Sequence, residues 1–259
     1  MIFALISIFI FGTIIGSFLN VVILRLNTGR GLHGRSACFT CRKELRAIEL
    51  IPLFSFFMQG GKCTNCKSRI SWQYPAIETV TGFVFTLLFI IQFSVNSLSS
   101  VGILPFLFEC FIFSLIIIIS VYDIRHKIIP NKMVWIFITT SFIFGVFSFG
   151  NFFFVLFSGI AMSLPFLLLH YLSGGRLMGL GDGKLALGCG FLLGIWLSAT
   201  AFIFSFWIGA IISILLLIFV NKKFTIKSEI PFGPFLAIST FIAFLLSLDI
   251  FSFLNFFIR

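Results

Sequence analysis

The chain has few charged residues: Lys, Arg, Asp and Glu together make up 10% of its 259 residues. A soluble globular domain carries about 25%, so this composition excludes an ordinary soluble protein, and it equally excludes a disordered chain. Only six residues are cysteine, which excludes a disulfide-rich secreted module. Hydrophobic residues make up 59% of the chain and include 40 phenylalanines. We therefore expect the lipid bilayer to be the main solvent of this protein.

The apolar runs predict an all-α polytopic membrane protein with about eight transmembrane helices. One span needs roughly 20 apolar residues. Two runs supply one span each and three longer runs supply two each. The single spans are residues 2–24 and 232–258, and the paired spans are residues 76–122, 133–172 and 185–220. The paired spans are expected to turn near Asn96–Ser100, Gly150–Asn151 and Ser198–Thr200.

Acidic residues are even scarcer than basic ones, with eight against 18, and the net charge is +10. Seventeen of the 18 basic residues fall in residues 25–75, 123–132, 173–184 and 221–230. The positive-inside rule places these segments in the cytoplasm and both termini outside. We expect the basic residues to meet anionic membrane lipids. We expect no nucleic-acid partner, because no aromatic residues alternate with basic ones outside the membrane.

Three domains follow from this topology. Residues 1–25 form the first transmembrane helix, residues 26–75 form a cytoplasmic loop domain, and residues 76–259 form a membrane-embedded domain. The loop is the only sizeable segment outside the predicted spans.

Four cysteines in the cytoplasmic loop form two C-x2-C pairs, Cys38 with Cys41 and Cys63 with Cys66. Each pair can direct two thiolates at one ion, and four sulfurs complete the closed tetrahedral shell of structural zinc. The reducing cytoplasm disfavours disulfides. The spacing therefore predicts a zinc-ribbon-like site, with a redox role or unligated thiols as the alternatives.

Two aspartates, Asp123 and Asp182, fall at the same predicted cytoplasmic boundary of the membrane. An acidic group at this depth is costly and indicates a function. Two carboxylates brought together share one proton, so that one can act as a base and the other as an acid. The alternative is a local ion pair for each, Asp123 with Arg125 or Lys127 and Asp182 with Lys184.

Six segments, in this order, resemble the prepilin peptidases, or type IV leader peptidases, which are polytopic aspartyl proteases of the GxGD class. The segments are GSFLNVVILRL at 16–26, the cysteine loop, RISWQYPAIE at 69–78, DIRHKIIPN at 123–131, GLGDGK at 179–184 and IPFGPFLA at 230–237. Together they cover nearly the whole chain.

The resemblance implies a function. Such enzymes act in type IV pilus and type II secretion systems, where they remove a basic leader from prepilins or pseudopilins at the cytoplasmic face of the inner membrane. Members with the cysteine loop commonly also N-methylate the new N-terminus with S-adenosylmethionine. The resemblance assigns Asp123 and Asp182 to catalysis and the four cysteines to zinc.

The glycines that flank the second aspartate, Gly179, Gly181 and Gly183, allow close backbone approach, and with Lys184 they are predicted to support the active site. Glu78 has two interpretations, a contact for the basic leader or an interfacial carboxylate paired with a loop arginine. Gly233 and Pro234 are expected to break a helix beside the active site. Three alternative functions stay open: a peptidase without methylation, a polytopic transporter, and a zinc-ribbon scaffold.

Overall fold

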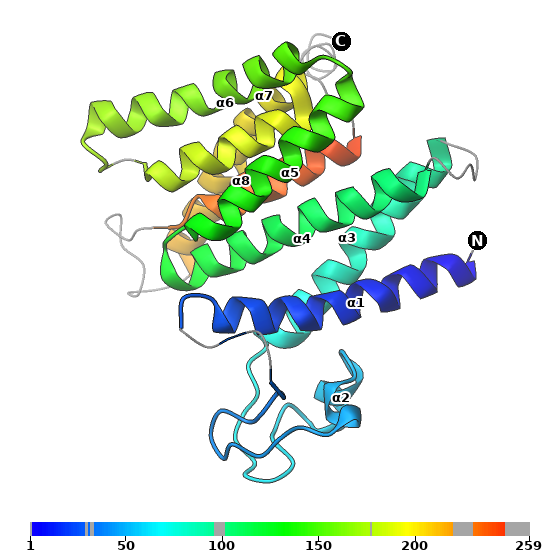
Figure 1. Ribbon diagram of the computed structural model, residues 1–259. Helices are drawn as coiled ribbons and strands as arrows, with labels where there is room; N and C mark the ends of the chain where they lie inside the picture. Colours follow the sequence, from blue (N-terminus) through cyan, green and yellow to red (C-terminus); the bar gives the residue numbers. More distant parts are fainter. Residues whose placement is uncertain are drawn as a thin grey trace. The chain divides into compact units, whose positions relative to one another are not determined.

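The computed structural model describes residues 2–28, 31, 34–95, 102–176, 178–219 and 230–246, and this part of the chain is helical (Figure 1). Its helices are α1 (Ile2–Arg25), η1 (Ala47–Leu50), α2 (Phe54–Met58), α3 (Gln73–Val95), α4 (Ile103–His126), α5 (Asn131–Phe149), α6 (Phe152–Ser173), α7 (Leu180–Phe219) and α8 (Gly233–Leu246). The described residues form no strand longer than an isolated bridge.

The prediction of an all-α polytopic membrane protein is confirmed. Six of the described helices are long and apolar enough to cross a membrane: α1, α3, α4, α5, α6 and α7. Helix α8 is apolar but shorter. Two parts of the prediction lie outside the described residues: the turn expected near Asn96–Ser100 and the end of the last expected span, residues 247–258.

The expected turn near Ser198–Thr200 is wrong in position. The backbone of α7 leaves helical geometry at Gly194, where φ is 70° and ψ is 177°. A positive φ of this kind costs glycine little. The hydroxyls of Ser198 and Thr200 instead bond back to the carbonyls of Ile195 and Trp196, so both residues stay within the helix.

The chain forms two compact units, Met1–Cys110 and Phe111–Arg259. In the first unit, α1 packs against α3 through small residues. A Cβ atom on Gly12 would lie 2.8 Å from Gly82 Cα, and one on Gly16 would lie 2.8 Å from Glu78 Cα. Such close backbone approach is typical of helix pairs in membranes.

In the second unit, α7 is the central helix and contacts α5, α6 and α8 (Figure 1). The backbones of α6 and α7 meet closely, since a Cβ atom on Gly190 would lie 2.7 Å from Gly159 Cα. Helix α4 contacts α8 through Phe113, whose ring lies 5.1 Å from that of Phe241. This packing holds the C-terminal end of α4 and the first turns of α7 and α8 within one unit.

Candidate active site and metal centre

Asp123 lies in the last turn of α4 and is almost fully buried, with 4% of its surface exposed. Its Oδ2 atom accepts a hydrogen bond of 3.1 Å from the backbone N–H of Gly233, the first residue of α8. The first N–H groups of a helix carry a partial positive charge and stabilise an anion. A Cβ atom at position 233 would lie 2.7 Å from the same oxygen, so only glycine fits here without displacing the carboxylate.

Asp182 lies in the first turn of α7, and its Oδ2 atom accepts a hydrogen bond of 3.2 Å from the backbone N–H of Gly179. Asp123 and Asp182 interact electrostatically. The structure therefore brings together the two aspartates, which come from different helices, and gives each a backbone donor from a glycine.

The segments around the two aspartates are joined by further contacts. Lys184 Nζ donates a hydrogen bond of 2.9 Å to Asn131 Oδ1 and lies 5.9 Å from the ring centre of Trp135. Gly181 packs on Ile129, where an added Cβ atom would lie 2.9 Å from the isoleucine Cβ. These contacts hold residues 123–131 and residues 179–184 against each other. Gly183 is buried and faces Leu167 of α6.

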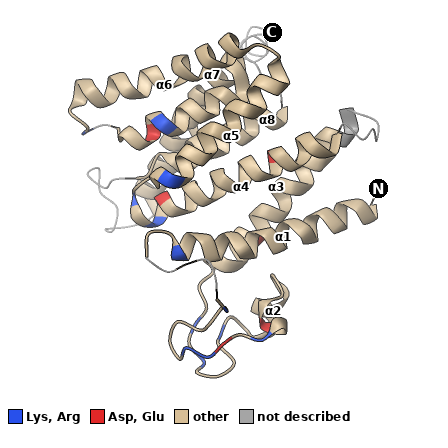
Figure 2. Ribbon diagram, viewed as in Figure 1, with Lys and Arg blue, Asp and Glu red and all other residues tan. Residues whose placement is uncertain are grey.

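Neither aspartate takes part in an ion pair with another described residue. The ion pairs in the described part of the chain are Arg35–Glu44 and Lys43–Glu49, both in the loop. In Figure 2, the described charged residues of the second unit lie at one end of its helices, on the left of the view. Described basic residues thus lie at the same end of the unit as the two aspartates, and no ion pair between them and the aspartates is formed among the described residues.

Two contacts at this site escaped the sequence analysis. Gly233 was expected to break a helix, but α8 begins there and its N–H is the partner of Asp123. The sequence analysis assigned no separate role to Asn131, the last residue of the first aspartate motif, although its side chain accepts a hydrogen bond from Lys184. A glycine followed by proline and then an apolar run is itself typical of a helix start, because proline is favoured in the first turn.

Glu78 lies in the first unit, in α3, and is buried with 6% of its surface exposed. Its Oε2 atom accepts a hydrogen bond of 2.8 Å from the backbone N–H of Leu53. Its carboxylate also interacts with the hydroxyl of Ser17. No arginine of the described loop forms an ion pair with it.

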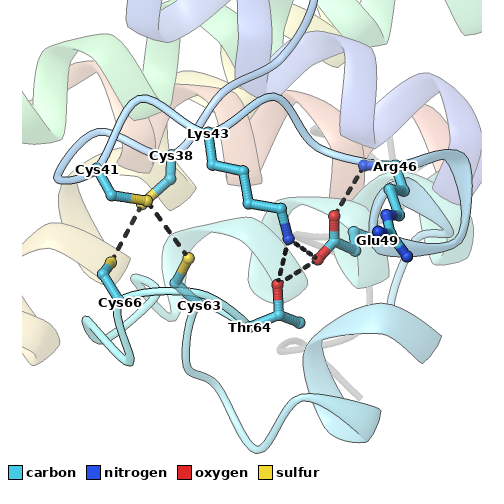
Figure 3. Close-up of polar contacts among 8 residues, drawn as sticks. All are labelled: Cys38, Cys41, Lys43, Arg46, Glu49, Cys63, Thr64 and Cys66. Atoms are coloured by element: carbon cyan, nitrogen blue, oxygen red, sulfur yellow. Dashed lines mark hydrogen bonds and ion pairs between the residues drawn. The ribbon is translucent and has the colours of Figure 1, made fainter.

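The four cysteines lie on two turns of the same construction (Figure 3). In each turn, the first cysteine accepts a backbone bond from the residue four positions on, Arg42 or Lys67, and both of these residues have positive φ. Each turn is closed by one antiparallel bridge, Ala37 with Glu44 and Lys62 with Arg69. This construction directs the two thiols of each turn toward the other turn.

The cysteine cluster fits zinc. All four sulfur atoms lie within 4.8 Å of one another, with Cys38 Sγ 3.8 Å from Cys66 Sγ and Cys41 Sγ 4.0 Å from Cys63 Sγ. A tetrahedral ion with Zn–S bonds of about 2.3 Å holds its sulfurs about 3.8 Å apart. Backbone N–H groups of Cys41 and Thr40 lower the pKa of the Cys38 thiol to about 6. The hydroxyl of Ser68 lowers the pKa of Cys66, so two of the four thiols are shifted toward the thiolate form that a metal requires, whereas the pKa of Cys63 is raised.

A small polar network links the two cysteine turns (Figure 3). Lys43 Nζ donates to Thr64 Oγ1 at 3.0 Å and lies 3.6 Å from Glu49 Oε1. The Thr64 hydroxyl donates to Glu49, which also accepts a bond from the Arg46 N–H. The Arg46 N–H and the Thr64 hydroxyl hold the pKa of Glu49 below its usual value. The network therefore contributes to the alignment of the turns.

Comparisons with known proteins cover most of the chain. Residues 10–92 match the family model described as "Bacterial Peptidase A24 N-terminal domain", and residues 110–214 match "Type IV leader peptidase family". A protein of Bacillus subtilis (strain 168) named prepilin leader peptidase/N-methyltransferase is 34% identical over 248 residues, which are 95% of each chain. Proteins of the same name are 29% identical in Pseudomonas aeruginosa (90% of this chain, 87% of the relative) and in Neisseria gonorrhoeae (91% and 88%). No solved structure matches the chain.

The cysteine geometry predicts one zinc ion per chain. Cys66→Ser should reduce the zinc content of the purified protein severalfold, because a structural site needs all four ligands. Cys189→Ala is the matched control, since Cys189 is buried in α7 of the second unit and does not belong to the four-cysteine cluster, and it should keep the zinc. Metal analysis by mass spectrometry measures both. A wild-type protein with four reduced loop thiols and no zinc would contradict the assignment.

Proposed function

The chain belongs to the type IV leader peptidase family, and from that premise we propose that it cleaves the leader from type IV prepilins or pseudopilins and then N-methylates the new N-terminus. The observation that carries the proposal is the arrangement of Asp123 and Asp182, two carboxylates from different helices that interact electrostatically and each accept a glycine N–H. The name shared by the relatives supports both reactions.

The chemistry follows from two carboxylates that cannot both ionise cheaply. One carboxylate keeps a proton while the other stays charged, and the pair titrates as a unit. The charged carboxylate takes a proton from water, which attacks the carbonyl carbon of the scissile peptide. The protonated carboxyl gives its proton to the carbonyl oxygen, and the leaving amine takes up a proton as the C–N bond breaks. Gly179, Gly181, Gly183 and Lys184 support this pair through the contacts described above.

The protein is a multipass membrane protein, and we place the aspartate pair at the cytoplasmic face of the inner membrane with both termini outside. The basic residues that gather at the same helix ends support this orientation through the positive-inside rule (Figure 2). A basic leader would lie in the cytoplasm, while the apolar segment after the cleavage site would lie among the spans. This arrangement brings the scissile peptide to the depth of Asp123 and Asp182.

We assign the methyl-transfer step to the chain as a whole, with S-adenosylmethionine as the methyl donor. The loop domain, residues 26–75, is the part that would carry structural zinc. The name of the relatives supports the methyl donor, and the sulfur geometry supports the zinc. We assign peptide cleavage to the membrane-embedded residues 76–259. The two activities are therefore expected to differ in their dependence on the cysteine cluster.

The aspartate pair makes a first prediction. Asp123→Asn and Asp182→Asn should each lower leader cleavage by on the order of 10³-fold or more, because an amide can neither take nor give the proton. Cleavage of a purified prepilin by the reconstituted variants measures this. Asp249→Asn, which changes the remaining aspartate of the chain, is the matched control and should cleave like the wild type. A well-inserted Asn variant that cleaves at the wild-type rate would remove that aspartate from the mechanism.

The different dependence of cleavage and methyl transfer on the cysteine cluster makes a second prediction. Cys66→Ser should lower N-methylation much more than leader cleavage, because loss of zinc unfolds the loop while the aspartates sit on membrane helices. Mass spectrometry of the processed pilin separates cleaved from cleaved-and-methylated product. Cys189→Ala should keep both activities. Equal loss of both would show that the loop is needed for the peptidase itself.

The charge of the leader makes a third prediction. Residues 25–75 carry nine basic and two acidic residues and repel a basic leader. Of the three glutamates in the loop or in the first turns of α3, Glu44 and Glu49 are paired with basic side chains, whereas Glu78 is not. We therefore assign the contact with the leader to Glu78.

Glu78→Lys should then weaken processing of a Lys/Arg-bearing leader more than of a neutralised leader, whereas Glu44→Lys, the exposed control, should do little. Cleavage rates on the two leaders provide the measurement. Equal impairment of both leaders would leave Glu78 only its structural bond to Leu53.

A further inference from the structure

The short helix α2 exposes its apolar side and covers its polar one. Phe54, Phe57 and Met58 have 53%, 65% and 72% of their surfaces exposed, and their spacing places them on one face of the helix. The polar residues Ser55 and Gln59 are half-buried on the other side. This arrangement is the reverse of the one expected for a loop helix in water.

The exposed apolar surface extends beyond the helix. Leu50 and Ile51, which precede α2, are 41% and 43% exposed. Phe56, by contrast, is buried and lies against Gly61 of the second cysteine turn. The loop therefore packs one aromatic side chain inward and leaves five large apolar side chains within residues 50–58 exposed, a concentration that is typical of an interaction surface.

A hydrogen bond fixes the depth of α2. Leu53, the residue just before α2, donates its N–H to Glu78 over 2.8 Å. Glu78 lies five residues inside α3, a helix long and apolar enough to cross the membrane. Five residues of helix correspond to about 7.5 Å. Helix α2 thus begins level with the first turns of a spanning helix, at the membrane boundary.

A pocket of about 460 Å³ lies between α2 and the second cysteine turn. Its aromatic wall is formed by Phe56, Phe57 and Trp72, and its basic residues are Lys62 and Arg69, which face each other across a β-bridge. Trp72 is 70% exposed and immediately precedes α3. An exposed tryptophan at the mouth of a span is typical of the membrane–water interface.

We propose that α2 and this pocket form an interfacial anchor that binds an anionic phospholipid. The face of Phe54, Phe57 and Met58 enters the upper acyl region, and Lys62 and Arg69 receive the phosphate of the headgroup. The bond from Leu53 to Glu78 fixes the depth of α2 in the membrane interface. The excess of basic over acidic residues in the loop makes the site select a negatively charged lipid. The anchor shares Glu78 with the proposed leader contact, but none of its lipid-facing residues belongs to the pair of Asp123 and Asp182.

The test uses Trp72 as a reporter in the full-length protein reconstituted into vesicles. The chain has four tryptophans, so Trp135, Trp196 and Trp207 are changed to Phe. The vesicles contain phosphatidylcholine with about 30% phosphatidylglycerol, an anionic content suited to a basic interfacial surface, and either lipid is brominated in its upper acyl chain. We expect brominated lipid to quench Trp72, and brominated phosphatidylglycerol to quench about twofold more than phosphatidylcholine at equal mole fraction.

Two double variants separate the parts of the anchor. Phe57→Ser with Met58→Ser should lower quenching by both lipids, whereas Lys62→Glu with Arg69→Glu should remove only the preference for phosphatidylglycerol. Lys67→Glu, which reverses one exposed charge outside the pocket, is the control and should keep both effects. Zinc content verifies that each variant retains a folded loop.

Three results would overturn the proposal. Quenching of Trp72 by aqueous iodide but not by brominated lipid would place the pocket in water. Equal quenching by the two lipids would remove the anionic headgroup site. Release of Trp72 from lipid quenching by S-adenosylhomocysteine would identify the pocket as a site for the methyl donor instead.

Discussion

The hydrogen bonds from Gly233 to the buried Asp123 and from Gly179 to the partly buried Asp182 are the interactions on which the candidate site depends. A carboxylate at the edge of a bilayer is costly unless donors replace the water it has lost. Here the donors are backbone N–H groups at the starts of α8 and α7, which bring partial positive charge without a basic side chain. The aspartates therefore stay free of ion pairs with described residues, and their carboxylates remain available for proton transfer.

The structure of the cysteine loop, residues 26–75, depends on a different constraint, the geometry of four sulfur atoms. Two turns with the same backbone bonds and one bridge each set the cysteines, and the network of Lys43, Thr64 and Glu49 links the turns. Such a small segment buries little apolar surface of its own. The bond from Leu53 to Glu78 ties the loop to α3, and the zinc ion proposed for the cysteine cluster would supply the stability that a small core cannot.

Much of this could be predicted from the sequence, because hydropathy and cysteine spacing are local signals. The apolar runs predicted the all-helical membrane fold, and the two C-x2-C pairs predicted the sulfur cluster that the structure contains. The break of α7 was placed wrongly, because hydropathy is uniform across Gly194 and Ser198 and only backbone geometry distinguishes them. The bond from Gly233 to Asp123 joins residues far apart in the sequence, and no local pattern encodes it. The exposed apolar face of α2 was also unforeseen, since composition does not reveal which side of a five-residue helix is covered.

The most direct test of this account is the kinetics of Gly233→Ala. The added methyl group would lie 2.7 Å from Asp123 Oδ2 and must displace it. Moving the carboxylate by about 1 Å to relieve this contact should lower leader cleavage by about 10²-fold. Zinc content and membrane insertion should stay at wild-type levels. Pro234→Ala, which changes the neighbouring residue without adding an atom toward the aspartate, should cleave at close to the wild-type rate. A Gly233→Ala protein that cleaves as fast as the wild type would contradict the role given to the start of α8.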